Sequence, residues 1–227
     1  CPTASWREIC IADRGISDPH PAKSDLKDRH ANAIQCDYCF YAPENSKTTI
    51  VVATDTDAGG GVAFSGVKKG GVDAFAVRAM SAWIMTLGMT DIVMQADKEN
   101  SLLDFCRQVE KAAPSVEFTI RSSKFTIRSS PVESHQSNGA AERFVRTVKE
   151  ALTTWEWDLA RRGFVLLPTS PLFHWLVRHC AWLSTRYQTK GSGHSAFYHR
   201  TGREYTKPVF TFGEAVMIRD PKSGQKK

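Results

Sequence analysis

The sequence predicts an α/β fold in which helices flank the faces of one mixed β-sheet. Its 227 residues, 41% of them hydrophobic, suffice for one core and part of a second small domain. Short apolar runs bounded by turn residues alternate with segments whose apolar residues recur at helical spacing. The resulting order is three strands, a helix, a strand, a helix, a strand and then helices, which favours a mixed sheet covered by helices.

The first three predicted strands lie before residue 70. The run AIQCDYCFY (33–41) is apolar and aromatic, and the turn-like APENS follows it, which is typical of a buried strand with Asp37 in its middle. Residues 48–56 and 61–69 are separated by glycines and predict a hairpin that continues the same sheet.

Helices and strands then alternate. Helical spacing predicts an amphipathic helix that Gly88 ends, and its apolar residues are Val72, Phe75, Ala76, Ala79, Met80, Trp83, Ile84 and Leu87. The run DIVMQAD (91–97) predicts a short strand ending on Asp97. Asn100 or Ser101 can cap the following helix, whose apolar residues are Leu102, Leu103, Phe105, Cys106 and Val109.

A short internal repeat occupies the place of the fifth strand. EFTIRSS (117–123) is followed at once by KFTIRSS (124–130). The repeat is too short for a repeat architecture, and a sheet of this kind has one slot at that point. We therefore expect one copy to form the strand and the other to form a loop or hairpin.

The segment SHQSNGAAERFVRTVKEAL (134–152) predicts a polar loop that leads into a long helix with Glu142 near its start. Its apolar face carries Val145, Val148, Leu152 and Trp155. Arg146 and Lys149 follow Glu142 by four and seven residues, so all three share the opposite face. A carboxylate beside two cations suits a site that binds a metal ion and a phosphate backbone together.

Charge is divided unevenly along the chain. Residues 1–142 carry 15 Lys and Arg against 18 Asp and Glu, whereas residues 143–227 carry 15 against 6, which together give the net charge of +6. The basic second half favours a polyanionic partner, with nucleic acid ahead of an anionic membrane. The apolar stretch 74–89 is interrupted by Arg78 and is too short to span a bilayer.

Three motifs resemble a known family. QSNGAAERFVRTVK is similar to the loop and helix around the third acidic residue of integrases from retroviruses and long-terminal-repeat retrotransposons, members of the ribonuclease H-like superfamily. IQCDYCFY and MQADKENSLLDF resemble the two strands that carry the other acidic residues. SAFYHRTGREY and FGEAVMIR, within 195–219, are similar to the stretch that follows the core in copia-type elements.

The resemblance implies a DDE-type polynucleotidyl transferase. Asp37, Asp97 and Glu142 would be its catalytic residues and would hold two Mg²⁺ or Mn²⁺ ions. The implied activity is DNA 3′-end processing followed by strand transfer. Contacts to nucleic acid are expected from Gln136, Asn138, Arg146 and Lys149.

The resemblance also implies partners and a cellular location. The expected partners are the DNA ends of the element, a target duplex and further copies of the chain, with no membrane. We expect the protein in the nucleus after a cytoplasmic phase, and not secreted.

The resemblance divides the chain into three parts. Residues 1–31 would be a linker or a degenerate remnant of an N-terminal zinc module, 32–190 the catalytic core, and 191–227 a post-core segment with the start of a strand-rich C-terminal domain. WREIC resembles the end of that zinc module, with Cys10 at its last ligand position and Arg7 where another Cys would stand. Cys36 and Cys39 would point to opposite faces of a strand, so Zn²⁺ is not expected there.

Several alternatives remain open at the level of the sequence. Asp55 and Asp57 compete with Asp37, although they precede AGGG, where Asp commonly shapes a turn. The interval from Asp97 to Glu142 is 44 residues, and removing the repeat would leave 37, so the repeat is interpreted as an insertion that either loops out or displaces Glu142. A catalytically inert nucleic-acid-binding remnant and a cut-and-paste transposase are the rival functions, and the latter should lack the copia-like tail.

Overall fold

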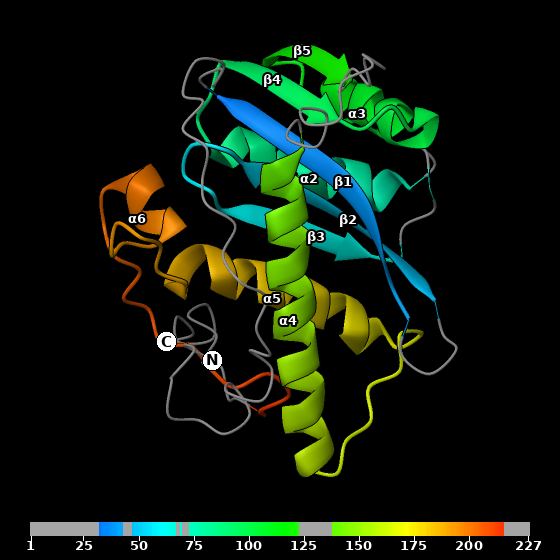
Figure 1. The fold of residues 1–227 in the computed structure, drawn as a ribbon, viewed down its shortest axis with the longest axis vertical. Helices are drawn as coiled ribbons and strands as arrows, with labels where there is room; N and C mark the ends of the chain where they lie inside the picture. Colours follow the sequence, from blue (N-terminus) through cyan, green and yellow to red (C-terminus); the bar gives the residue numbers. More distant parts are fainter. Residues whose placement is uncertain (1–31, 43–46, 67–68, 70–72, 123–137, 216–227) are drawn as a thin grey trace, which may run out of the picture.

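A five-stranded mixed sheet forms the centre of the molecule, as the sequence predicts (Figure 1). The structure is a computed structural model and describes residues 32–42, 47–66, 69, 73–122 and 138–215. Its strand order is β3-β2-β1-β4-β5. The bounds are β1 (Ala33–Tyr41), β2 (Thr48–Asp55), β3 (Gly61–Ser65), β4 (Asp91–Ala96) and β5 (Glu117–Ser122).

Strand direction changes at the middle of the sheet. β1, β2 and β3 are antiparallel neighbours, whereas β4 runs parallel to β1 and β5 runs parallel to β4. Antiparallel strands can be joined by short turns, but parallel strands need a crossover. Both crossovers contain a helix. In the strand order, β1, which carries Asp37, is the central strand.

Helices cover both faces of the sheet (Figure 1). Buried residues of α2 and α3 pack with one face of the sheet, and those of α4 and α5 pack with the other. The bounds are α2 (Ala74–Thr86), α3 (Asn100–Ala112), α4 (Gly139–Arg161), α5 (Pro171–Tyr187) and α6 (Ala196–Thr201). The α/β fold class with flanking helices is confirmed.

Alternation along β1 separates the two cores. Cys36 belongs to the core under α2 and α3, whereas Cys39 belongs to the core under α4 and α5. Successive side chains of a strand point to opposite faces, and three residues reverse the direction. The CxxC pair therefore does not converge, and both thiols are buried.

The start of α3 differs from the prediction. Glu99 occupies the N-cap position and makes no side-chain hydrogen bond to the helix backbone, so neither Asn100 nor Ser101 caps the helix. Instead, the Lys69 Nζ donates to Glu99 Oε1 at 2.5 Å, and the Ser101 hydroxyl donates to the same oxygen. The prediction was wrong because Glu99 takes the N-cap position, and its side chain contacts Lys69, which precedes it by 30 residues and is not part of the local sequence pattern.

The first copy of the repeat forms the fifth strand. β5 spans Glu117–Ser122 and pairs with β4, whereas residues 124–130 lie outside the described residues. Residues 1–31 and 216–227 also lie outside them. Beyond α6 the described residues 202–215 form neither helix nor strand, so the strand-rich C-terminal domain stays a prediction.

No helix within the described ranges is long and apolar enough to cross a membrane.

Candidate active site

The parallel pairing of β1 with β4 brings two of the predicted carboxylates together. Cys36 pairs with Ala96, and Asp37 and Asp97 are the next residue of each strand segment. Equivalent positions on neighbouring strands are about 4.8 Å apart in the sheet. Two acidic residues distant in sequence thus become neighbours at the end of β4.

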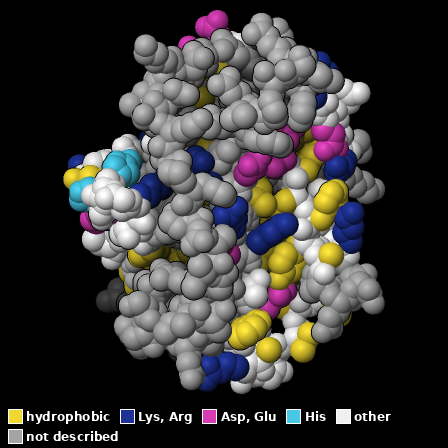
Figure 2. Space-filling view, viewed as in Figure 1, with side chains coloured by type: hydrophobic (Ala, Val, Ile, Leu, Met, Phe, Trp, Pro, Cys, Tyr) yellow, Lys and Arg dark blue, Asp and Glu magenta, His cyan; other side chains and the backbone are white. Residues whose placement is uncertain are grey.

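Glu142 reaches the same place from α4. It lies exposed in the first turn of that helix, and its charge is one of those that raise the pKa of Asp37. Figure 2 shows acidic side chains gathered where the upper end of α4 crosses β1, with Lys and Arg side chains next to them. Glu142 therefore lies near enough to Asp37 for its charge to act on that carboxylate.

Gln35 of β1 holds the start of α4 in place. Its Oε1 accepts hydrogen bonds from the backbone N–H groups of Ala140 and Ala141 at 2.8 and 3.2 Å. The first N–H groups of a helix have no partner within the helix, and Asn138 at the N-cap makes no side-chain cap bond. A buried strand side chain thus supplies the cap and positions Glu142 relative to Asp37.

The electrostatics of the site are those of crowded carboxylates. Burial, and next the charge of Asp97, raise the pKa of Asp37 to about 6, with smaller effects from Glu142 and Glu99. A backbone hydrogen bond from Tyr38 opposes the rise. Like charges brought together in a half-buried place favour the neutral acid unless a cation joins them.

The donor set fits a hard divalent cation. Carboxylate oxygens are the ligands that Mg²⁺ prefers, and a cation would relieve the repulsion that raises the pKa of Asp37. Among the residues with described positions, no group of three or more His, Cys, Asp and Glu side chains is already close enough to hold a metal ion. The fit therefore rests on the chemistry of the donors and their shared electrostatics.

Solved structures with a similar fold are integrases of retroviruses. The HTLV-2 integrase catalytic core domain in complex with magnesium, in its trimeric form, gives a TM-score of 0.51 at 15% identity, covering 75% of this chain and 96% of that one. A chain of the simian T-cell lymphotropic virus intasome with the PP2A regulatory subunit B56 gamma gives 0.53 at 13% identity, covering 84% and 60%. This chain has the fold of a retroviral integrase catalytic core. No protein-family model and no curated protein sequence matches it.

Within this integrase-type fold, Asn138 has a different place from the predicted one. Its side chain is 3% exposed, and its Nδ2 donates to the backbone carbonyl of Cys36 at 3.1 Å. The predicted contact with DNA gives way to a contact with β1, because the start of α4 lies directly on that strand. The buried Oδ1 has no hydrogen-bond partner.

The predicted cations of α4 do face outward. Arg146 is exposed and Lys149 is half-buried, on the helix face that also carries Glu142. The opposite face is buried, as predicted, with Phe144 as an additional core residue beside Val148 and Leu152. Gln136, the remaining predicted DNA contact, lies outside the described residues.

The competing acidic residues serve other structures. The carboxylate of Asp55 is 2% exposed, pairs with Arg200 and accepts a hydrogen bond from the backbone N–H of Asp57. The Asp57 Oδ2 accepts from the backbone N–H of Asn32 at 3.1 Å. Asp55 thus shapes the turn between β2 and β3, the role considered for it from the sequence, whereas Asp57 joins this turn to the residue before β1.

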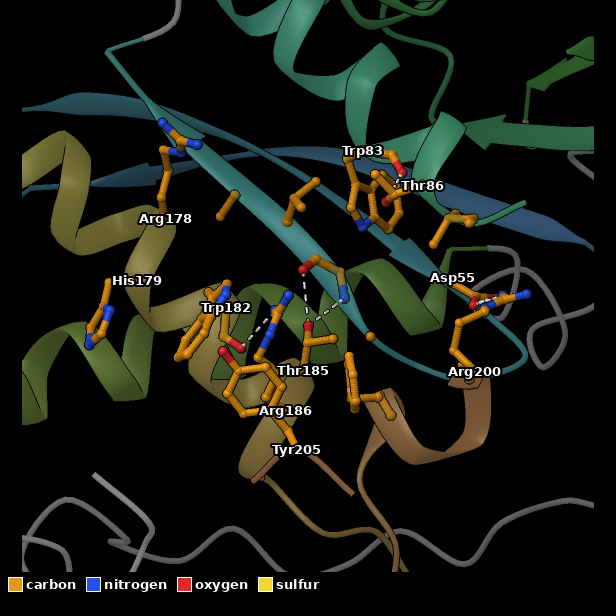
Figure 3. A pocket seen from close by; sticks show the side chains of 18 of the residues that line it. Asp55, Trp83, Thr86, Arg178, His179, Trp182, Thr185, Arg186, Arg200 and Tyr205 are labelled. Carbon is orange, nitrogen blue, oxygen red and sulfur yellow. Dashed lines mark hydrogen bonds and ion pairs between the residues drawn. The ribbon is translucent and has the colours of Figure 1, made fainter. Parts of the chain in front are cut away.

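A cavity in the described part of the fold lies on another surface (Figure 3). It encloses about 960 Å³ between α2, β3, α5 and the segment after α6. Figure 3 shows Trp83 facing the Trp182, Arg186 and Tyr205 group, with the ion pair of Asp55 at one end. None of the three predicted carboxylates lines the cavity, so its walls do not contribute to the candidate active site.

Replacing Gln35 by Leu is expected to destabilise the protein by about 1–3 kcal/mol, because the two backbone N–H groups of α4 lose their acceptor. Unfolding in urea measures the change. Gln95→Leu is the matched control, since the Gln95 Oε1 accepts a hydrogen bond from Gln35 Nε2 at 3.3 Å on the neighbouring strand β4. Equal losses from the two substitutions would contradict the capping role.

The raised pKa of Asp37 predicts a pH-dependent stability in EDTA. The pKa of about 6 in the folded state lies above the ordinary aspartate pKa of 3.8, so the native state binds more protons between these two pH values and stability falls as pH rises through this window. Asp37→Asn removes the effect. We expect its stability relative to wild type to increase by about 1–2 kcal/mol from pH 4 to pH 7, after allowing for screening of a half-buried group. A constant difference across that range would show that the pKa of Asp37 is not raised in the folded protein.

Proposed function

We propose that this chain is the catalytic core of a retroelement integrase, a metal-dependent polynucleotidyl transferase that acts on DNA. The observation that supports the proposal is that the charges of Asp97, just after β4, and of Glu142, at the start of α4, both act on Asp37 of β1. The fold supports the same reading, because it is shared with retroviral integrase cores.

The proposed reaction has two steps. Water cleaves a phosphodiester bond near the end of the element's DNA and leaves a free 3′-hydroxyl group. That hydroxyl then attacks a phosphodiester bond of the target, so that one P–O bond forms and another breaks, without a covalent bond to the protein. Both steps are displacements at phosphorus and need the same alignment of attacking and leaving oxygens.

Each residue of the site has a part in this reaction. Asp37, Asp97 and Glu142 would hold Mg²⁺ or Mn²⁺, which when bound supplies a Lewis acid for the phosphate oxygens. Arg146 and Lys149 hold the DNA backbone beside the carboxylates on the outward face of α4. Gln35 and Asn138 fix the start of α4 on β1 and thereby keep Glu142 aligned.

The resemblance to copia-type elements extends the proposal to the partners. The post-core motifs within 195–219 favour a long-terminal-repeat retrotransposon as the source, and the DNA partners are then the element ends and a target duplex. The HTLV-2 cores are described as trimeric and dimeric forms. We propose that this chain also acts as a homo-oligomer, and that it does so in the nucleus.

Strand transfer by the purified protein tests the proposal. A labelled duplex that carries the element's end is incubated with target plasmid and either Mg²⁺, Mn²⁺ or EDTA. Joined product that depends on the divalent cation is expected. DNA binding without product in any of the three conditions would favour the inert remnant, an alternative motivated by the absence of a ready-made three-ligand group among the described residues.

A further inference from the structure

An exposed aromatic ring with two lysines lies at the end of β1. Phe40 is 39% exposed and belongs to neither core cluster of the described residues. The Lys47 Nζ lies 3.8 Å from the centroid of its ring, and the Lys69 Nζ lies 5.1 Å from it. Both distances are those of cation–π contacts. The packing of the core does not account for an apolar ring held at the surface among ammonium groups.

This lysine–aromatic cluster borders the carboxylates. Lys69 also forms an ion pair with Glu99 at 2.5 Å. Glu99 follows Asp97 by two residues, and its charge is among those that act on Asp37. Phe40 stands three residues beyond Asp37 on the same strand, which is roughly 10 Å along the backbone. Side chains three residues apart on a strand point to opposite faces, so the Phe40 ring lies on the face of β1 opposite to Asp37. Among the described residues β4 pairs with β1 only as far as Cys36, and a DNA end bound at the carboxylates would reach the ring by passing around this edge of β1.

The chemistry of the cluster suits unpaired nucleotides. Proteins that bind single strands combine aromatic rings, on which bases stack, with cations that contact the backbone phosphates. In a duplex the faces of the bases are already covered by their neighbours, but a base at an unpaired end has a free face. A base that takes the place of one ammonium group on the ring leaves that lysine beside the adjacent phosphate.

We propose that Phe40, Lys47 and Lys69 form a binding platform for the unpaired end of a DNA strand. A base stacks on Phe40, and the two lysines hold the neighbouring phosphates. The platform rests on the proposed function and adds to it a preference for DNA ends with a single-stranded overhang.

Binding of two labelled DNAs in EDTA tests the platform. One is a blunt duplex and the other is the same duplex with a five-nucleotide overhang, and fluorescence anisotropy gives both affinities. Wild type is expected to prefer the overhang. Phe40→Ala should reduce that preference by roughly 5- to 100-fold, the range expected for losing one stacked base. Phe40→Tyr and Phe40→Trp should retain it, because both keep an aromatic face.

Two further sets of variants make the result specific. Phe75→Ala is the matched control, because Phe75 is 54% exposed on α2 and contacts Phe64. It should leave the preference unchanged. Lys47→Gln and Lys69→Gln should each lower the slope of log affinity against log salt by about 0.7 for the overhang.

The outcomes separate the platform from the proposed function. An overhang preference that survives in Phe40→Ala, or that Phe40→Tyr loses, overturns the platform while strand transfer by wild type remains intact. Wild type that binds neither DNA and joins no ends overturns both proposals. If Phe40→Ala fails to fold by circular dichroism, Phe40→Tyr and the lysine variants decide, and unchanged salt slopes in both lysine variants then count against the platform.

Discussion

Asp97→Asn and Glu142→Gln are each expected to lower the rate of strand transfer by roughly 10²- to 10⁴-fold. The reason is that polarisation of a phosphate oxygen by a held cation is worth several kcal/mol, and about 1.4 kcal/mol corresponds to a tenfold change in rate. Asp37→Asn should have the same effect. The measurement is single-turnover joining of a pre-processed DNA end in Mg²⁺.

Glu150→Gln is the control for this experiment. Glu150 lies on α4 two turns after Glu142, is exposed, and undergoes the same chemical change. It should retain the wild-type rate. If Glu142→Gln also retained that rate, the assignment of the third carboxylate would be wrong.

Thermal unfolding gives a second readout of the same three residues. Divalent cation at about 100 times its dissociation constant should stabilise wild type by about 2.7 kcal/mol, or roughly 5–10 °C in Tm. Asp97→Asn and Glu142→Gln should show a much smaller shift in Mg²⁺ or Mn²⁺. A full shift in both variants would place the cation elsewhere.

Arg200→Met is expected to lower the free energy of unfolding by about 3 kcal/mol, the largest loss of stability among the single substitutions considered. Asp55 is 2% exposed, so removal of Arg200 leaves a buried carboxylate without its ion-pair partner. The loss of stability should fall at the low end of the range for breaking a buried ion pair, because a second cation lies near Asp55. Lys190 remains nearby, donating to the carbonyl of Ala58. Tm should fall by roughly 6–12 °C.

An exposed ion pair provides the comparison. Arg162 and Asp158 are partly exposed and lie at 2.9 Å, and Arg162→Met should cost less than about 1 kcal/mol. The double variant Asp55→Asn with Arg200→Met should be more stable than Arg200→Met alone, because no unpaired charge remains. A double variant as unstable as the sum of its parts would show that Arg200 acts through packing.

The parts of the site that follow strand and helix periodicity could be predicted from the sequence. The apolar and aromatic run 33–41 predicts β1, and the order of elements predicts the mixed sheet in which the β1–β4 pairing makes Asp37 and Asp97 neighbours. The buried residues of α4 predict which face of that helix points outward, and thus where Arg146 lies.

The contacts that align these elements could not be predicted in the same way. Gln35 is a polar residue in an apolar strand, and its partners Ala140 and Ala141 have no polar side chain to mark them. Asn138 is a polar residue of a kind that often contacts DNA from a loop, but the docking of α4 on β1 buries it. Both outcomes depend on tertiary packing, for which a local pattern carries no information.

The cap that β1 provides for α4 has a consequence for the order in which the molecule folds. Gln35 and Ala140 are separated by 105 residues, and contacts of long sequence separation form late because the chain between them must first be ordered. The start of α4 therefore becomes a complete helix end only after the central strand is in place. We expect Asp37 and Asp97 to be assembled by the sheet first, and Glu142 to join them in one of the last folding steps.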